Sequence, residues 1–110
     1  MNLKNLSSKL KYRSAWDGWD DREVSGAFSS DLLSDVMAHS DEGQLLITIQ
    51  AHKNTVAVAV LKDLAGLVIA SNRLIPKDMI ESARDEGIPI FVTGDNQYEA
   101  GWRLHELGGF

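Results

Sequence analysis

The chain has 110 residues, a length that corresponds to one domain with a single buried core. Its net charge of -5 and the lack of a basic stripe argue against binding to the phosphate backbone of nucleic acids. No apolar run approaches the roughly 20 residues of a membrane span. Residues 1–6 lack an apolar signal core, so we expect a cytoplasmic protein with no membrane partner. Cysteine is absent, which excludes disulfides, thiolate nucleophiles and cysteine-ligated iron–sulfur clusters.

The N-terminal part of the chain reads as a helix, a turn and a strand. Residues 2–10 repeat leucine at helical spacing, which predicts a short amphipathic helix. In residues 12–21 a glycine stands among aspartates and tryptophans, which favours a turn. The side chains of Trp16 and Trp19 either cover an edge of the core or form an exposed surface for a partner. A strand is expected over residues 23–28.

A second helix is expected to begin at Asp31, with Ser29 or Ser30 as its N-cap. The carboxylate of Asp31 would suit the positive end of the helix. The apolar stripe of this helix consists of Leu32, Leu33, Val36 and Met37. The helix is expected to end near His39, before a turn at residues 41–43.

The middle of the chain reads as a β-α-β unit, around which the rest is organised. Residues 44–50 and 65–70 are short apolar runs, typical of parallel strands buried on both faces. Residues 55–64 would form the crossover helix, with Asn54 as its N-cap. Because residues 56–60 are largely β-branched, a strand in an antiparallel meander is the alternative. We favour the helix, since parallel neighbours need a crossover.

The C-terminal part adds a further helix, strand and helix. Pro76 suits the first turn of a helix, where its missing N–H is tolerated, and Gly87 would end that helix. Residues 88–93 predict a strand, and Asn96 and Glu99 have the spacing of a capping box before the last helix. The alternation of helices and strands predicts an α/β domain of three layers, α/β/α, with βα repeats and a mostly parallel sheet of about four strands.

Polar side chains follow each expected strand, and ligands bind parallel sheets at the carboxyl ends of their strands. These residues are Ser29, Ser30, Asp31, Gln50, His52, Lys53, Asn54, Ser71, Asn72, Arg73, Thr93, Asp95 and Asn96. Ser30 and Asn54 would cap helices whose N–H groups frame an anion, His52 and Lys53 would contact it, and Arg73 would be its charge partner. The predicted ligand-binding set also includes Asp31, Gln50 and Thr93. The alternative is that these loops are polar because they are exposed.

Motifs for catalysis and for metal binding are weak. The three histidines are too scattered for a metal site, and a phosphate-cradling Gly-x-x-x-x-Gly-Lys-Ser/Thr loop is missing. Ser29 or Ser30 with His52 and Asp31 would imitate a hydrolase triad, but the Gly-x-Ser-x-Gly elbow is missing. We therefore expect no catalytic residues, no metal and no cofactor.

Two stretches of the chain resemble the DRTGG domain family. Asp-Arg-Glu-Val-Ser-Gly at residues 21–26 is followed by Ser-Asp-Leu-Leu-Ser-Asp-Val-Met at residues 30–37. The likeness continues through residues 46–54 and 63–66 and extends from about Leu3 to Leu107. The pentapeptide that names the family is reduced here to its first two residues, Asp-Arg.

The resemblance implies one regulatory, non-catalytic domain over residues 1–110, with a fold similar to the N-terminal half of HPr kinase/phosphorylase. Domains of this family accompany CBS pairs in nucleotide-regulated pyrophosphatases, and short stand-alone members are linked to iron-only hydrogenase systems. The family also implies a homodimer, which the apolar residues 56–61 would suit. We therefore expect a dimeric domain that binds a small anionic metabolite or nucleotide, or modulates a partner enzyme. The alternatives are a protein-interaction adaptor without a ligand site and, least favoured, a small serine hydrolase.

Overall fold

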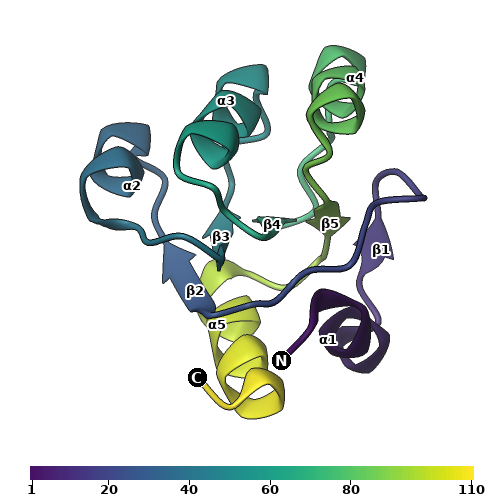
Figure 1. Cartoon of the computed structure of the whole chain (residues 1–110), viewed down its shortest axis with the longest axis vertical. Coiled ribbons are helices and arrows are strands. Elements are labelled where there is room, and N and C mark those ends of the chain that lie inside the picture. Colours follow the sequence, from purple (N-terminus) through teal and green to yellow (C-terminus); the bar gives the residue numbers. More distant parts are fainter.

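The structure, a computed structural model, describes all 110 residues and has three layers, with helices on both faces of one sheet (Figure 1). The strands are β1 (Arg13–Ser14), β2 (Gly26–Ser29), β3 (Gln44–Thr48), β4 (Gly66–Ile69) and β5 (Ile90–Val92). The helices are α1 (Leu3–Leu10), α2 (Leu33–His39), α3 (Lys53–Leu61), α4 (Lys77–Glu86) and α5 (Gln97–Gly108). The three-layer α/β/α class predicted from the sequence is confirmed. None of these helices is both long and apolar enough to cross a bilayer.

The sheet has the strand order β1-β5-β4-β3-β2, and its four longer strands are parallel. Helix α3 connects β3 to β4, so the predicted crossover helix is confirmed and the antiparallel meander is excluded. Because β2, β3, β4 and β5 point the same way, their carboxyl ends lie along one edge of the sheet. This edge is called the carboxyl edge below.

Strand β1 was not expected, and it makes the sheet five-stranded instead of about four-stranded. Arg13 pairs with Val92 and Ser14 with Phe91, antiparallel to β5. The turn predicted over residues 12–21 is therefore wrong at its start. Two residues are too few to show the alternation by which strands are recognised in a sequence.

The chain after β1 is anchored to the core by several contacts. The backbone N–H of Ala15 donates to the carbonyl of Ile90 at 2.8 Å, and the indole N–H of Trp16 donates to the carbonyl of Ile88 at 2.8 Å. The ring of Trp19 meets Phe91 edge-on, with ring centroids 5.6 Å apart. Trp16 is only 7% exposed, so the prediction that these tryptophans cover an edge of the core is confirmed.

Helices cover both faces of the sheet (Figure 1), and an apolar cluster lies between the sheet and the helices on each face. The side chains of α2, α3 and α4 pack on one face, and those of α1 and α5 pack on the other. Alternation along β3 sends Leu46 to the first cluster and Leu45 and Ile47 to the second. An isolated helix as short as α1 is marginal in water, so the burial of its three leucines, at about 1.5–3 kcal/mol each, stabilises it in place.

Two of the predicted N-caps are wrong. Helix α2 has Leu32 as its N-cap, without a side-chain hydrogen bond, whereas the Ser30 hydroxyl accepts from the Leu32 N–H at 3.2 Å outside the helix. Helix α3 is capped by His52, whose Nδ1 accepts from the N–H of Asn54 at 3.1 Å. Asn54 therefore lies inside the first turn. The capping box predicted at the start of α5 is confirmed.

Helices α2 and α3 expose more apolar surface than their sequences suggest. In α2 only Val36 is buried, and Leu32, just before the helix, is 64% exposed. In α3 Val60 and Leu61 are exposed, Leu61 to 71%. Helices α2 and α3 lie in the same outer layer of the molecule (Figure 1).

Candidate functional site

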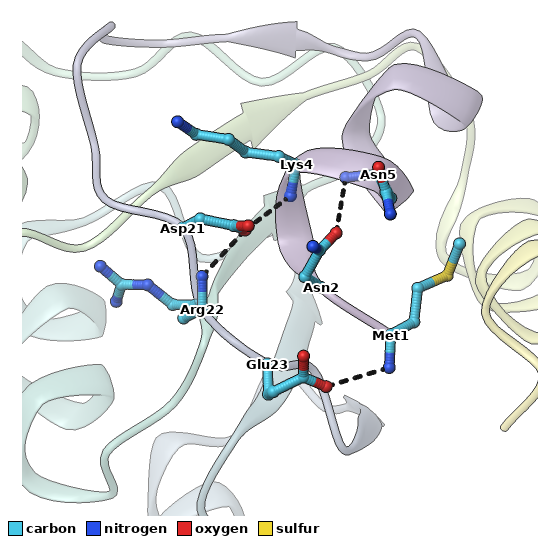
Figure 2. A network of polar contacts seen from close by, with 7 residues as sticks. All are labelled: Met1, Asn2, Lys4, Asn5, Asp21, Arg22 and Glu23. Atoms are coloured by element: carbon cyan, nitrogen blue, oxygen red, sulfur yellow. Dashed lines mark hydrogen bonds and ion pairs between the residues drawn. The ribbon is translucent and has the colours of Figure 1, made fainter.

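The Asp21–Arg22 pair, where the DRTGG resemblance begins, makes structural contacts away from the carboxyl edge. The Asp21 carboxylate accepts from the backbone N–H of Lys4 at 2.9 Å in the first turn of α1, and from that of Arg22 at 2.9 Å, as Figure 2 shows. The Arg22 guanidinium donates to the carbonyl of Gly87, where α4 ends, at 2.9 Å. This pair therefore joins the start of the chain to the helix layer on the other face.

Asp31 is the centre of a polar network at the carboxyl edge. Its Oδ1 accepts three hydrogen bonds of 3.0 Å, from the Thr48 hydroxyl, the Ile49 N–H and the Gln97 side-chain amide. The carboxylate thus connects the loop after β2, the end of β3 and the start of α5. The prediction that Asp31 sits in the first turn of α2 is wrong, because α2 begins two residues later. Gln97 was not predicted, since it lies 66 residues away in sequence.

Ser30 and Gln50 belong to the same region and are also bonded within the protein. The Ser30 N–H donates to the carbonyl of Ile47 at 3.2 Å, and the Gln50 N–H donates to the Thr48 hydroxyl at 3.1 Å. The Gln50 carbonyl accepts from the Thr55 hydroxyl at 2.8 Å. These bonds fix the loop between β3 and α3.

No hydrogen bond assembles the imitation of a hydrolase triad. The Ser30 hydroxyl is engaged with Leu32, the Nδ1 atom of His52 caps α3, and Asp31 is bonded within the network described above. Ser29 lies on the edge strand β2.

Lys53 lies among acidic residues. It lines a hollow between α3 and α4 whose other side chains are Asp78, Glu81, Ser82, Asp85 and Glu86. The four carboxylates of this hollow outnumber the one ammonium group, so the local field disfavours an anion. The structure therefore does not bring Lys53 into one pocket with Arg73, with which it was paired in the sequence-based prediction.

The loop after β4 runs across the end of β5. Ser71 and Asn72 both have positive φ, 62° and 56°, which turns the chain sharply. The Ser71 N–H donates to the carbonyl of Asp95 at 2.8 Å and the Asn72 N–H to that of Thr93 at 2.9 Å. The Thr93 hydroxyl accepts from the Asp95 N–H at 3.0 Å, so this predicted site residue shapes the loop that follows β5. The next residue of the first loop is Arg73.

Arg73 and Arg13 are both exposed and line one open hollow of the surface, called the Arg13–Arg73 pocket below. The antiparallel register of β1 opposite β5 places the Arg13 side chain on the same face as that of Val92, which is the face covered by α4. The pocket has a volume of about 270 Å³. Its lining residues are Arg13, Ala15, Asn72, Arg73, Leu74, Ile75, Ile80 and Val92. Two guanidinium groups and a carboxamide thus stand beside five apolar side chains, without an acidic one.

The two arginines of the pocket differ electrostatically from Arg22 and Arg103. Arg22 donates to backbone carbonyls, and Arg103 forms an ion pair with Asp95 at 2.8 Å. Neither Arg13 nor Arg73 has an ion-pair partner in the structure. Two positive charges that share a pocket without a counter-charge favour the binding of an anion, which guanidinium groups can hold by paired hydrogen bonds.

Asp95 and Tyr12 form a separate cluster beyond the end of β5. The Tyr12 hydroxyl donates to Asp95 Oδ2 at 2.8 Å, and Arg103 binds the same carboxylate. Burial and the hydrogen bond to Asp95 raise the pKa of Tyr12 above its ordinary value. This cluster ties the segment before β1 to α5, and it leaves Asp95 already engaged with a cation.

Sequence comparison gives no relative: the chain matches no family model and no curated protein. Its fold, however, is similar to the crystal structure of the CBS and DRTGG domains of the regulatory region of Clostridium perfringens pyrophosphatase, complexed with the activator diadenosine tetraphosphate. The TM-score is 0.68 at 14% identity over 93% of this chain, which spans 45% of that one. An identity this low establishes likeness of fold alone. The chain thus has a DRTGG-like α/β fold, in agreement with the resemblance found in its sequence.

Proposed function

We propose that this chain is a non-catalytic regulatory domain that senses a small anionic ligand in the Arg13–Arg73 pocket. The observation that carries the proposal is the pair of guanidinium groups, without carboxylate partners, at the carboxyl edge of a parallel sheet. Ligands of open α/β sheets bind at this edge. The similar fold in the pyrophosphatase belongs to a regulatory region in complex with a nucleotide activator, which supports a ligand-sensing role.

The affinity expected of such a pocket is modest. A hydrogen bond to a charged group contributes about 1.5–3 kcal/mol, so two arginine contacts give about 3–6 kcal/mol, which corresponds to a Kd between roughly 6 mM and 0.04 mM. Contacts with the apolar wall would tighten binding further. A Kd in this range suits a domain that responds to changes in the concentration of a metabolite.

The pocket also provides a way to transmit binding. Its wall combines β1, the loop after β4 and α4, which are far apart in sequence. Strand β1 has only two residues in the sheet, so it is held less firmly than the central strands. An anion that bridges Arg13 and Arg73 would fasten this edge strand to the loop after β4, and a partner that contacts this edge would sense the difference.

Thermal unfolding with a panel of phosphorylated metabolites and nucleotides tests the proposal. A ligand at one hundred times its Kd stabilises the fold by about 2.7 kcal/mol, which raises the Tm by roughly 10 °C for a domain of this size. We expect Arg73→Ala and Arg13→Ala to abolish most of this rise. Arg84→Ala is the matched control, because it removes the same charge from the exposed surface of α4 outside the pocket.

The variant Lys53→Ala distinguishes binding in the Arg13–Arg73 pocket from binding at the site predicted from the sequence, which includes Lys53. We expect it to leave the ligand-induced rise in Tm unchanged, since Lys53 lines a different hollow. A full rise in the Arg73→Ala variant, or an equal loss in Lys53→Ala and Arg73→Ala, would move the site away from the pocket.

The exposed apolar residues of α2 and α3 favour a second candidate function, an interaction surface for another copy or a partner enzyme. Leu32 and Leu61 are more than half exposed, and Met37 and Val60 are 39% and 41% exposed. Helices α2 and α3 are neighbours in one layer, and exposed apolar patches mark sites of association. Sedimentation velocity tests this candidate: Leu61→Lys should turn a dimer into a monomer, whereas a wild-type monomer at high concentration would argue against self-association.

A further inference from the structure

The side chains that line the Arg13–Arg73 pocket are three with hydrogen-bond donors and five that are apolar. Guanidinium groups donate hydrogen bonds and cannot accept them, and the only side-chain acceptor in the lining is the carboxamide oxygen of Asn72. A ribose and a nucleobase carry several donors of their own. In this pocket most of those donors would lose water without gaining a side-chain acceptor, which is unfavourable.

The volume of the pocket points in the same direction. About 270 Å³ corresponds to roughly nine water molecules at about 30 Å³ each, so a ligand of about ten non-hydrogen atoms would fill it. A nucleotide is larger than this and would extend out of the pocket, and a dinucleoside polyphosphate would extend further.

Leu74 at the mouth of the pocket adds an independent observation. Its side chain is 91% exposed, the most exposed of the large apolar residues, although it lies directly beside Arg73. An apolar ligand body held by the two arginines would cover this side chain, whereas inorganic phosphate would leave it in water. Burial of apolar surface on both partners would then add to the charge interaction.

We infer that the ligand of this pocket is an amphipathic anion, with one phosphate or carboxylate head and a compact apolar body. The head lies between the guanidinium groups of Arg13 and Arg73, and the body lies against Leu74, Ile75 and Ile80. This inference rests on the proposed function and narrows it, since it favours a compact amphipathic anion over a polyphosphate nucleotide.

Titrations followed by ¹H–¹⁵N NMR test the inference with three probes: phenyl phosphate, inorganic phosphate and AMP. Phenyl phosphate has about eleven non-hydrogen atoms, close to the capacity of the pocket. We expect it to bind at least about tenfold more tightly than either inorganic phosphate or AMP. Benzoate, which carries the same ring on a carboxylate, separates the two kinds of head.

Two variants separate the apolar contact from the charge contact. Leu74→Ala should weaken the binding of phenyl phosphate about fivefold and leave the affinity for inorganic phosphate unchanged. A merely structural role of Leu74 would not produce this difference between the two probes. Arg73→Ala should weaken both probes at least about tenfold. Leu61→Ala is the matched control, because it shortens another exposed leucine outside the pocket and should change neither affinity.

The outcomes distinguish this inference from the proposed function. If AMP binds as tightly as phenyl phosphate and its binding depends on Arg73, the pocket senses anions but the amphipathic class is wrong. Equal affinities of the wild type and Leu74→Ala for phenyl phosphate would also overturn that class. If no probe binds in an Arg73-dependent manner, both the inference and the proposed function fail.

Discussion

Replacing Trp16 by Phe should destabilise the fold by about 2–4 kcal/mol. The indole N–H donates to the carbonyl of Ile88 at 2.8 Å in a buried environment, and its loss leaves that carbonyl unpaired, which costs about 1–3 kcal/mol. The smaller phenyl ring also leaves a void beside the cluster under α4, which adds about 1 kcal/mol. At roughly 4 °C for each kcal/mol in a chain of this length, the Tm should fall by about 8–16 °C.

The other two tryptophans provide graded controls in the same assay, denaturation by heat and by urea followed by circular dichroism. Trp19→Phe loses a longer hydrogen bond, 3.2 Å to the Ser14 hydroxyl, from a partly exposed ring and should cost about 1–2 kcal/mol. Trp102 is 54% exposed, so Trp102→Phe should stay within about 0.5 kcal/mol of the wild type. If Trp16→Phe were no more destabilising than Trp102→Phe, the segment after β1 would not be docked as described, and Arg13 would lose its place in the pocket.

Three further predictions concern the helix ends and the Tyr12 cluster. Asn96→Ala should lower the free energy of unfolding by about 1 kcal/mol. Glu99→Ala should lower it less in the Asn96→Ala background than in the wild type, because both side chains belong to one capping box. Fully additive effects in urea unfolding would contradict this. Gly87→Ala should cost about 1–2 kcal/mol, because Gly87 has φ of 72° with open space around it, so only the backbone conformation opposes the new methyl group; an unchanged Tm would argue against this cap. Above pH 10 the folded state holds the Tyr12 proton more tightly than the unfolded chain, since Asp95 and burial raise its pKa. The free energy of unfolding should therefore fall with rising pH in the wild type. Its slope should exceed that of Tyr12→Phe by up to about 1.4 kcal/mol per pH unit, and parallel curves for the two proteins would contradict this.

The central part of the fold could be predicted because local patterns and chain connectivity agree there. The strands β3 and β4 are apolar on both faces, which is a property of parallel strands between two helix layers. Helix α3 forms despite three β-branched valines because two parallel strands need a crossover between them. In this case the requirement of connectivity outweighs the weak local preference for a strand.

Strand β1 could not be predicted, because it consists of two residues whose partners lie more than 70 positions away. Its position depends on the packing of Trp16 and Trp19 against the edge of the core. From the sequence, this packing was only one of two interpretations of the tryptophans. Without β1, Arg13 appears as a lone cation in a turn. The pocket therefore contains one arginine that the sequence singled out, Arg73, and one that it missed.

Two predicted N-caps are wrong, and Lys53 lies apart from Arg73, for a related reason. Ser30 and Asn54 are both residue types that favour caps, but where each helix begins depends on the exit of the preceding strand and on contacts across the sheet. His52 caps α3 through a ring nitrogen, which common cap preferences do not include. Lys53 and Arg73 both follow strands of the sheet, and only the packing of α4 separates the hollows that they line.

The assignment of the ligand site is tested most directly by the Nε–Hε NMR signals of the arginines during a titration with phenyl phosphate. We predict that the signals of Arg13 and Arg73 shift together with a single Kd. Those of Arg22, Arg84 and Arg103 should stay in place. Signals of Arg13 and Arg73 that remain unmoved at saturating probe, or a shift confined to the other three arginines, would contradict the assignment.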